Sequence, residues 1–333
     1  MKRGLIHWDR TELPPAAFEA RLDGVRRTLA ERELPALAVY SDVWQSNQAR
    51  CLLNFMPYWN RSLAVIPREG KPILLCGLSP RVYPWIRSVT VLEEIRPSGN
   101  PARGLLELAS AERWKRIGIL DLPLLPQEIA APLCAGPVEV VNVPSNGFSE
   151  QGSAGLPGMD DWELLMRRRA AQMARKTLAE ELAQGAGAPD YQLVGRLERT
   201  FRRAGAEDLV ILLSDGRTVP IPARGKVLRE GFSVTVAMEY RGHWVKLSRP
   251  QASVQVAESL ENRWKILLQD FQRLAEPPIY AEILSGPYPY QFCDRFELRP
   301  GDLFAFHVEF RAGGRRLFYG DSCRFGETGA ELL

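Results

Sequence analysis

The sequence predicts an α+β protein, with an N-terminal α/β domain followed by a domain built on an antiparallel sheet. Two observations favour this class. Helical and strand-like patterns alternate through roughly the first 145 residues, which is typical of a sheet covered by helices. The order then changes to two helices, a strand, a hairpin, a helix and a closing pair of strands, which indicates antiparallel pairing.

The composition fits an ordinary globular protein with room for two domains. Of 333 residues, 45% are hydrophobic and 25% are charged, and the formal net charge is only +3. The triplet Arg167-Arg168-Arg169 lies inside an amphipathic helical pattern, so we expect a solvated helix face there. A nucleic-acid surface would be denser and interleaved with aromatic residues. We therefore expect no nucleic-acid partner.

Cysteine usage and apolar run length favour a cytoplasmic protein. The five cysteines are odd in number and lack C-x-x-C spacing, which suits a reducing compartment and argues against a zinc site. No apolar run approaches the ~20 residues of a membrane span. The start, M-K-R-G-L-I-H-W-D-R, carries an acidic residue too early for a secretory signal. We expect no membrane association.

The first domain is expected to contain helices and strands in alternation after a hairpin. Apolar residues recur at helical spacing behind Pro14-Pro15, and a charged turn at Arg68–Lys71 separates two apolar strands. The expected helices are 18–29, 105–114 and 129–133, and the expected strands are 36–40, 62–67, 72–76, 117–120 and 138–143. The stretch 144–158 is rich in Gly, Ser and Pro, so we place the boundary there, with domains at 1–150 and 151–333.

The second domain is expected to begin with a long helix capped by Asp160 and Asp161. Further helices are expected at 191–204 and 257–274, and strands at 209–213, 303–310 and 317–325, the last two joined at Gly313-Gly314. Between them, Leu228–Pro250 reads as a hairpin that turns at Arg241-Gly242. Its first strand places Val234, Val236 and Met238 on one face and Ser233, Thr235, Ala237 and Glu239 on the other.

This hairpin resembles the ligand-bearing hairpin of the creatinase, prolidase and aminopeptidase P superfamily, E-G-D-x-V-x-V-D-x-G-x-x-Y-x-G-Y-x-x-D-x-x-R. The residues in register are Glu230, Gly231, Tyr240, Gly242, Trp244 and Arg249. Leu298-Arg299-Pro300-Gly301-Asp302 and the ending Gly329–Leu333 also match the family pattern, as do Ala36–Asp42 and Ile66–Leu74 in the first domain. The resemblance implies a creatinase-type N-terminal domain and a pita-bread domain with a curved antiparallel sheet.

The same register implies that the metal centre of the family is lost. The family's four carboxylate ligands fall on Thr235, Lys246, His307 and Gly320, and no histidine lies between His243 and His307 to supply its His ligand. The family's further histidine, the general base of metal-free creatinase, is also absent, because Asp215-Gly216 leads to Pro222-Ala223. We expect no metal and no cofactor. Where the family's His-ligand loop maps is left open.

Three residues are candidates for remaining chemistry. Lys246 is expected to share its face with Thr235, where its ammonium either binds an anion, acts as a base or Schiff-base nucleophile, or pairs structurally with Glu239 or Glu309. His307 shares a strand face with Glu309, either as an acid/base pair or as a hydrogen-bonded filler. For His243 we expect simple packing.

Further candidates for substrate binding come from the resemblance. Trp59 and Arg61 are similar in placement to the aromatic residue and Arg with which creatinase-type enzymes hold a carboxylate substrate of the adjacent subunit. The alternative is an ordinary dimer contact. Tyr288, in Tyr288-Pro289-Tyr290, either lines a remodelled pocket or stiffens a turn.

These observations leave two functions open. The first is a protein inactive as a metallopeptidase that binds a small anionic molecule or peptide, or acts as a scaffold subunit. It would form a homodimer or a heterodimer with a metal-competent homologue. The second is a metal-independent, creatinase-type hydrolase or lyase that cleaves a C–N bond in a small carboxylated substrate. A third role, protein-partner recognition as in histone chaperones, has little support because no acidic or basic tail is present.

Overall fold

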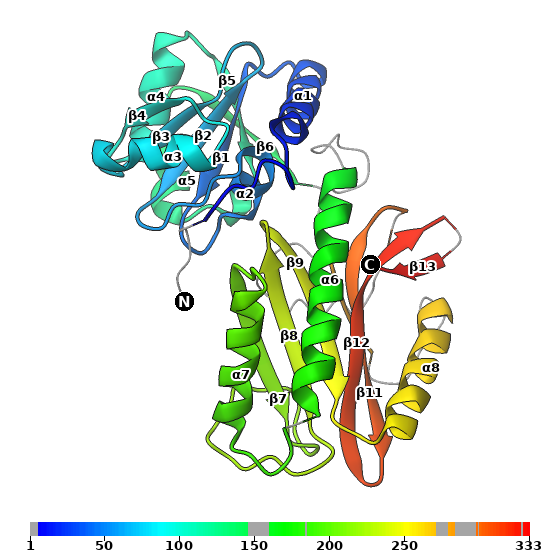
Figure 1. Ribbon diagram of the computed structural model, residues 1–333. Helices are drawn as coiled ribbons and strands as arrows, with labels where there is room; N and C mark the ends of the chain where they lie inside the picture. The colour runs from blue at the N-terminus through cyan, green and yellow to red at the C-terminus, as the bar shows by residue number, and fades with distance from the viewer. Residues whose placement is uncertain are drawn as a thin grey trace. The chain divides into compact units, whose positions relative to one another are not determined.

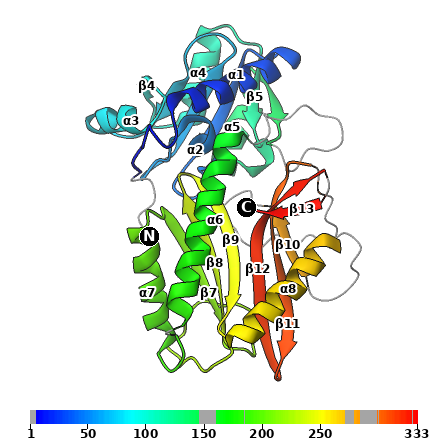
Figure 2. The ribbon, with the colours of Figure 1, turned by 45° about the vertical axis from the view of Figure 1, so that its right-hand side comes forward.

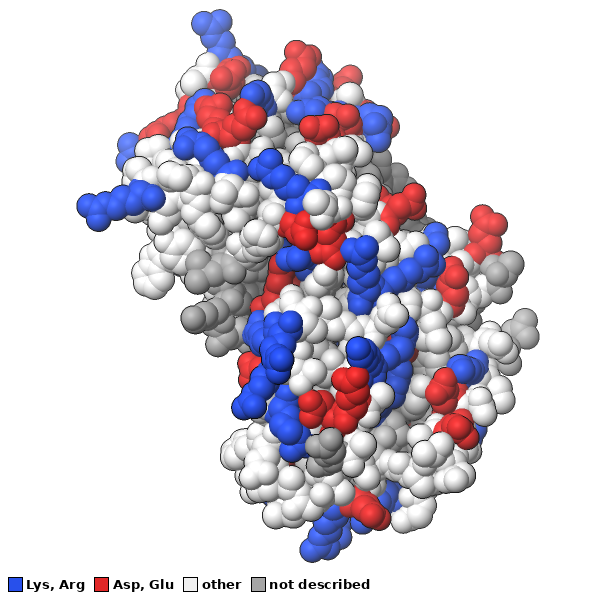
Figure 3. All heavy atoms as spheres, in the orientation of Figure 1, with Lys and Arg blue, Asp and Glu red and all other residues white. Residues whose placement is uncertain are grey.

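The computed structural model divides the chain into two compact units, Met1–Gly158 and Met159–Leu333. It describes residues 6–145, 160–183, 185–270, 279–283, 298, 300–327 and 329–333. Among these residues, no helix combines the length and the apolar character that crossing a bilayer requires. On the face shown in Figure 3, basic and acidic side chains are interspersed.

The first unit is a six-stranded mixed sheet with the order β4-β3-β2-β1-β5-β6 (Figure 1). β1 pairs antiparallel with β2, which continues the predicted hairpin into β3, while β5 and β6 run parallel to β1. The strands are β1 Ala36–Ser41, β2 Ser62–Pro67, β3 Ile73–Cys76, β4 Glu94–Pro97, β5 Arg116–Leu120 and β6 Glu139–Val143. The predicted α/β order is confirmed.

Helices cover both faces of this sheet because successive strand residues point to opposite sides, and both sides are apolar. Side chains of α1, α2 and α3 pack with Leu37 and Val39, and side chains of α4 and α5 pack with Ala36 and Ala38. The helices are α1 Pro15–Glu31, α2 Asn47–Leu53, α3 Tyr83–Val89, α4 Pro101–Ala111 and α5 Gln127–Cys134, with short 3₁₀ turns at Pro80–Val82 and Leu122–Leu124.

The second unit is a seven-stranded antiparallel sheet with the order β10-β11-β12-β9-β8-β7, and β13 pairs with β12. Its strands are β7 Asp208–Ser214, β8 Ser233–Tyr240, β9 His243–Pro250, β10 Ile279–Ile283, β11 Leu303–Ala312, β12 Arg315–Gly326 and β13 Gly329–Leu332. Both tight hairpins turn where expected. Arg241 and Gly242 have φ of 51° and 83°, and Gly313 and Gly314 have 56° and 73°, the positive values that two-residue hairpin turns require.

Three helices pack on one face of this sheet (Figure 2). α6 (Asp161–Leu182) and α7 (Asp190–Arg203) bury Val234, Val236 and Met238 of β8, as the alternation predicted. α8 (Val254–Asp270) buries the apolar face of β11, and the indole of Trp264 donates to the Phe306 carbonyl at 3.1 Å. The opposite face carries Thr235 of β8, Lys246 and Ser248 of β9 and His307 of β11.

The N-terminal half of α6 confirms the predicted cap and corrects part of the prediction for the arginine triplet. The Asp160 carboxylate caps the helix by accepting from the Glu163 amide at 2.7 Å. Arg168 and Arg169 are exposed, as expected of a solvated face, but Arg167 is only 8% exposed. Its guanidinium donates to the Glu163 carboxylate and to the Trp244 carbonyl, which fastens α6 to β9. A buried Arg is tolerated here because its donors meet a carboxylate and a carbonyl.

The joint between β9 and β12 connects the two halves of the sheet. The strands pair at Gly320 and Ser248. Next to this pair, the Ser322 hydroxyl accepts from the Lys246 amide at 2.8 Å and donates to the Lys246 carbonyl at 3.0 Å. The Ser322 hydroxyl thus forms both hydrogen bonds of the Lys246 main chain that a residue of a paired strand would otherwise form.

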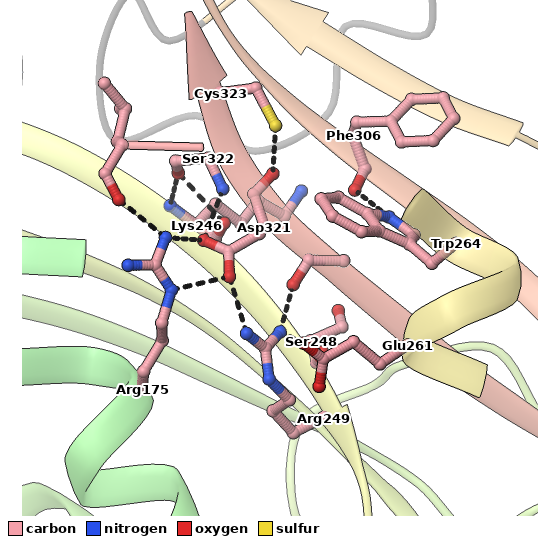
Figure 4. Close-up of polar contacts among 12 residues, drawn as sticks. Arg175, Lys246, Ser248, Arg249, Glu261, Trp264, Phe306, Asp321, Ser322 and Cys323 are labelled. Atoms are coloured by element: carbon pink, nitrogen blue, oxygen red, sulfur yellow. Dashed lines mark hydrogen bonds and ion pairs between the residues drawn. The ribbon is translucent and has the colours of Figure 1, made fainter. Parts of the chain in front are cut away.

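An ion cluster occupies the helix-covered side of the same joint (Figure 4). The Asp321 carboxylate, 1% exposed, accepts from the Arg175 guanidinium of α6 at 2.9 Å and from Arg249 of β9 at 2.5 Å. Arg249 also donates to the Gly320 carbonyl, and its guanidinium lies 4.4 Å from the centre of the Tyr319 ring. One carboxylate therefore ties α6, β9 and β12 together.

We predict that Asp321→Asn lowers the free energy of unfolding of the second unit by about 3–5 kcal/mol, because two guanidinium groups lose their buried counter-charge. Glu180→Gln is the matched control, since it removes a carboxylate from an exposed pair with Lys176 on the same helix, α6, and should cost below about 0.5 kcal/mol. Urea unfolding followed by circular dichroism measures both. Equal losses for the two variants would contradict the role of Asp321.

Candidate functional site

The face of the sheet opposite the helices gathers polar side chains of β8, β9 and β11 around Gly320 of β12. Directly paired residues of antiparallel strands project to the same side, and β8 pairs with β9 so that Thr235 faces Ser248 and Ala237 faces Lys246. Gly320 of β12 pairs with Ser248, and His307 of β11 pairs with Gly320. The four positions at which the sequence resemblance placed metal ligands, 235, 246, 307 and 320, thus lie on one face around the joint.

A chain of three buried side chains crosses this face. The Thr235 and Ser248 hydroxyl oxygens are 2.6 Å apart, and the Ser248 hydroxyl lies 2.8 Å from Nδ1 of His307. The three residues are 5%, 1% and 4% exposed. We call them the Thr235–Ser248–His307 chain. It connects the first hairpin strand with β11 across the joint.

The imidazole of His307 occupies the space that a side chain at position 320 would need. A Cβ atom built on Gly320 would lie 2.3 Å from Nδ1 of His307 and 2.8 Å from the Phe306 carbonyl oxygen. Atoms do not approach so closely without displacement, so a ring at 307 and a glycine at 320 depend on each other. This contact accounts together for the residues at 307 and 320, two of the four positions at which the sequence resemblance placed metal ligands.

His307 is a neutral imidazole. Burial, together with the positive charges of Lys246 and Arg249, holds its pKa well below the ordinary value. Nδ1 contacts Ser248, whereas Nε2 has no hydrogen-bond partner among the residues that the structure describes. A buried nitrogen in that state costs free energy until a ligand, water or undescribed group meets it.

Lys246 brings a positive charge to the same face. It is 8% exposed, its main chain is held by Ser322, and it lies close enough to His307 to depress the pKa of the imidazole. Of the two carboxylates expected as structural partners, Glu309 pairs with Arg316 through two hydrogen bonds of 2.8 and 2.6 Å. Glu309 therefore forms a structural ion pair with Arg316 within the hairpin β11–β12.

Glu239 lies on the Lys246 side of the hairpin and is 1% exposed. On the adjacent strand β7, Glu239 pairs with Asp208, which is also 1% exposed. Sequence reasoning did not identify Asp208. Sequence reasoning also missed Ser248 and Ser322. Ser248 was within reach, because a two-residue turn at 241–242 fixes the pairing of Thr235 with Ser248.

The first-unit candidates lie in a surface loop before β2. Trp59 is 69% exposed, and the Arg61 guanidinium pairs with the Glu128 carboxylate at 2.6 Å. That hydrogen bond raises the pKa of Arg61, which is ionised in any case. Tyr288 lies outside the described residues. His243 is buried, with Nδ1 3.8 Å from a Glu163 carboxylate oxygen, so packing is combined with a polar contact.

The residues at the four positions do not fit a divalent metal centre. A threonine, a lysine, a glycine and one neutral histidine offer a single imidazole beside an ammonium, and a divalent ion needs several anionic or neutral donors without a competing cation. Within the described part of the chain, no three His, Cys, Asp or Glu side chains are grouped so as to hold a metal ion.

Three solved structures with the same architecture are distant from this chain in sequence. The Xaa-Pro dipeptidase from Bacillus anthracis is 15% identical, with a TM-score of 0.67 over 95% of this chain and 97% of that chain. The X-Pro aminopeptidase from Thermotoga maritima is 15% identical, with a TM-score of 0.70 over 93% and 96%. The prolidase from Pyrococcus furiosus is 12% identical, with a TM-score of 0.65 over 92% and 98%.

These similarities confirm the pita-bread fold that the sequence resemblance implied, over nearly the full length of both chains. No protein-family model and no curated protein sequence matches the chain.

We predict that Gly320→Ala lowers the free energy of unfolding by about 1–3 kcal/mol, because the new methyl group collides with the His307 ring. In a His307→Ala background the same substitution should cost less, since the ring is gone. A double-mutant cycle from urea unfolding measures this coupling. If the costs are the same in both backgrounds, the ring does not occupy the space at position 320.

Proposed function

We propose that this chain is inactive as a metallopeptidase and binds a small carboxylate where the peptidases of its fold are expected to hold metal. The observation that carries the proposal is that Lys246 and a neutral His307, whose Nε2 lacks a partner among the described residues, share one buried face. A carboxylate supplies acceptor oxygens for both groups.

The charge balance supports an acid as the ligand. The register with the family removes four carboxylates and adds one ammonium. Glu309 does not offset that ammonium, because its own charge is matched by Arg316. Glu239 shares the face of Lys246, so its negative charge opposes an incoming carboxylate. The affinity therefore depends on Lys246 and His307 acting together.

The neighbours in structure set the size of the expected ligand. Their names describe Xaa-Pro dipeptidase, X-Pro aminopeptidase and prolidase, enzymes of short peptides. By analogy, we propose a ligand of amino-acid or dipeptide size with a free carboxylate. The first unit, through Trp59 and Arg61, would contribute in a homodimer or in a heterodimer with a metal-competent homologue, where this chain acts as a scaffold.

One observation favours the second function, metal-independent cleavage of a C–N bond in a carboxylated substrate. A neutral imidazole is the form that a general base requires when a nitrogen lone pair, rather than an N–H, faces the substrate, and the depressed pKa of His307 keeps the ring neutral. Release of ammonia or an amine from amidino and N-acyl amino acids would detect this activity, and its loss in His307→Gln would assign the base. Absence of turnover across such a panel would leave binding as the function.

We predict that the purified protein holds no stoichiometric Mn²⁺, Co²⁺ or Zn²⁺ and hydrolyses no Xaa-Pro dipeptide when these ions are added. The reason is the donor set at positions 235, 246, 307 and 320. Elemental analysis before and after chelation is the measurement. One or two metal equivalents per chain, lost together with activity on chelation, would contradict the proposal.

We predict that small carboxylates bind the wild type and lose about tenfold or more in affinity in Lys246→Met, because a charge-assisted hydrogen bond contributes about 1.5–3 kcal/mol. Glu239→Gln is the matched opposite variant, and it should bind the same acids more tightly. Isothermal titration calorimetry with acetate, proline and glycylproline provides the values. Equal binding by all three proteins, or binding of cationic compounds only, would rule out the carboxylate site.

A further inference from the structure

The Thr235–Ser248–His307 chain limits where its hydrogen atoms can lie. Each hydroxyl group has one hydrogen to donate, and a neutral imidazole has one N–H and one nitrogen lone pair. Among the described residues, Ser248 is the partner of the Thr235 hydroxyl, and Thr235 and His307 are the partners of the Ser248 hydroxyl. Two contacts therefore share three hydrogen atoms, and because Ser248 can donate to only one neighbour, three arrangements are possible. In one of them Thr235 and Nδ1–H both donate to Ser248, which leaves the Ser248 hydrogen and the Nε2 lone pair without partners among the described residues. In the other two, donation runs in a single direction along the chain.

In the first direction, Nδ1–H of His307 donates to Ser248 and Ser248 donates to Thr235. The Thr235 hydrogen then has no acceptor among the described residues, and Nε2 is a lone pair without a donor. Two buried groups remain unsatisfied. Each such group costs about 1–3 kcal/mol.

In the second direction, Thr235 donates to Ser248 and Ser248 donates to Nδ1. Both hydroxyl hydrogens are then used, and the imidazole carries its own hydrogen on Nε2. One buried group, Nε2–H, remains without a partner among the described residues. This arrangement leaves one fewer unsatisfied group than the first.

We infer that Ser248 acts as a positioning residue that holds His307 as the Nε2–H tautomer, so that the site presents a hydrogen-bond donor to its ligand. Lys246, two residues before Ser248 on β9, is also a donor without acceptor capacity. The two groups together select a ligand atom that accepts and carries no hydrogen. A deprotonated carboxylate oxygen fits that requirement, whereas an amine or amidinium does not.

The ligand class rests on the proposed function, but the tautomer does not. The tautomer is a property of the free protein and can be measured without any ligand. Failure of the tautomer and failure of carboxylate binding are therefore separate results.

Long-range ¹H–¹⁵N correlation spectra of ¹⁵N-histidine-labelled protein test the tautomer. The chain has three histidines, so the His307 signals are those lost in His307→Asn. At neutral pH we expect a protonated, pyrrole-type Nε2 and an unprotonated, pyridine-type Nδ1. A protonated Nδ1, or an imidazolium with both nitrogens protonated, would overturn the inference.

Variants of Ser248 separate positioning from simple packing. Ser248→Ala removes the donor to Nδ1, so we expect the His307 signals to shift toward a mixture of both tautomers. Ser248→Thr restores a hydroxyl group and should restore the Nε2–H pattern. Thr235→Val keeps the Ser248 donor and should leave the pattern unchanged. If Ser248→Ala keeps the wild-type pattern while remaining folded, Ser248 does not position the ring.

A ligand titration completes the test. Acetate should shift the His307 Nε2 resonance, and acetamidinium, a cation of similar shape, should not. Ser248→Ala should weaken acetate binding by roughly five- to tenfold, because the donor is no longer held. If the Nε2–H tautomer is found but acetate leaves the resonance unchanged, the tautomer stands and the proposed carboxylate ligand is wrong. If acetamidinium shifts the resonance instead, the donor-site inference is wrong.

Discussion

The main-chain pairing of Gly320 with Ser248 fixes which face each polar side chain around the joint of β9 and β12 occupies. Because strand residues alternate between faces, this pair sends Asp321 toward the helices and leaves Lys246, Ser248 and His307 on the opposite side. The helix-covered side is closed by an ion cluster in which Asp321 meets Arg175 and Arg249. The joint thus carries the ion-paired Asp321 on one face and, on the other, His307, whose Nε2 has no hydrogen-bond partner among the described residues.

The two faces of the sheet differ in how their buried polar groups are stabilised. The Asp321 carboxylate is buried with its oxygens in contact with two guanidinium groups and the Ser322 amide. His307 has no such counter-charge, and Lys246 and Arg249 both oppose its protonation, so the imidazole stays neutral. A buried histidine beside cations behaves as a hydrogen-bonding group rather than as an ion. Its chemistry therefore depends on the direction of donation and not on a net charge.

Much of this fold is readable from the sequence. The cap at Asp160, the hairpin turns and the opposite faces of β8 follow from local rules, and the structure confirms them. Short elements such as α2, α3 and β4 were not predicted, because seven or fewer residues give too little periodicity to recognise. The partners of Asp321 and Arg167 were also beyond reach, since the contacts of Asp321 with Arg175 and of Arg167 with Trp244 join residues far apart in the chain. Thr235, Lys246 and His307 of the polar face were identified from the sequence, whereas Ser248 and the hydrogen bonds that join it to Thr235 and His307 were not.

The contact between the His307 ring and the Gly320 backbone limits which single substitutions this face accepts. With the ring in place, a side chain at position 320 would meet Nδ1 of His307 at 2.3 Å from its Cβ atom, so it enters only if the ring moves. A change at 307 removes that contact, but it leaves Ser248 without its imidazole partner, and the Phe306 carbonyl oxygen still lies 2.8 Å from the Cβ position. Each single change at 307 or 320 therefore begins with a loss of packing or of a hydrogen bond. Positions 307 and 320 are thus expected to vary together rather than one at a time.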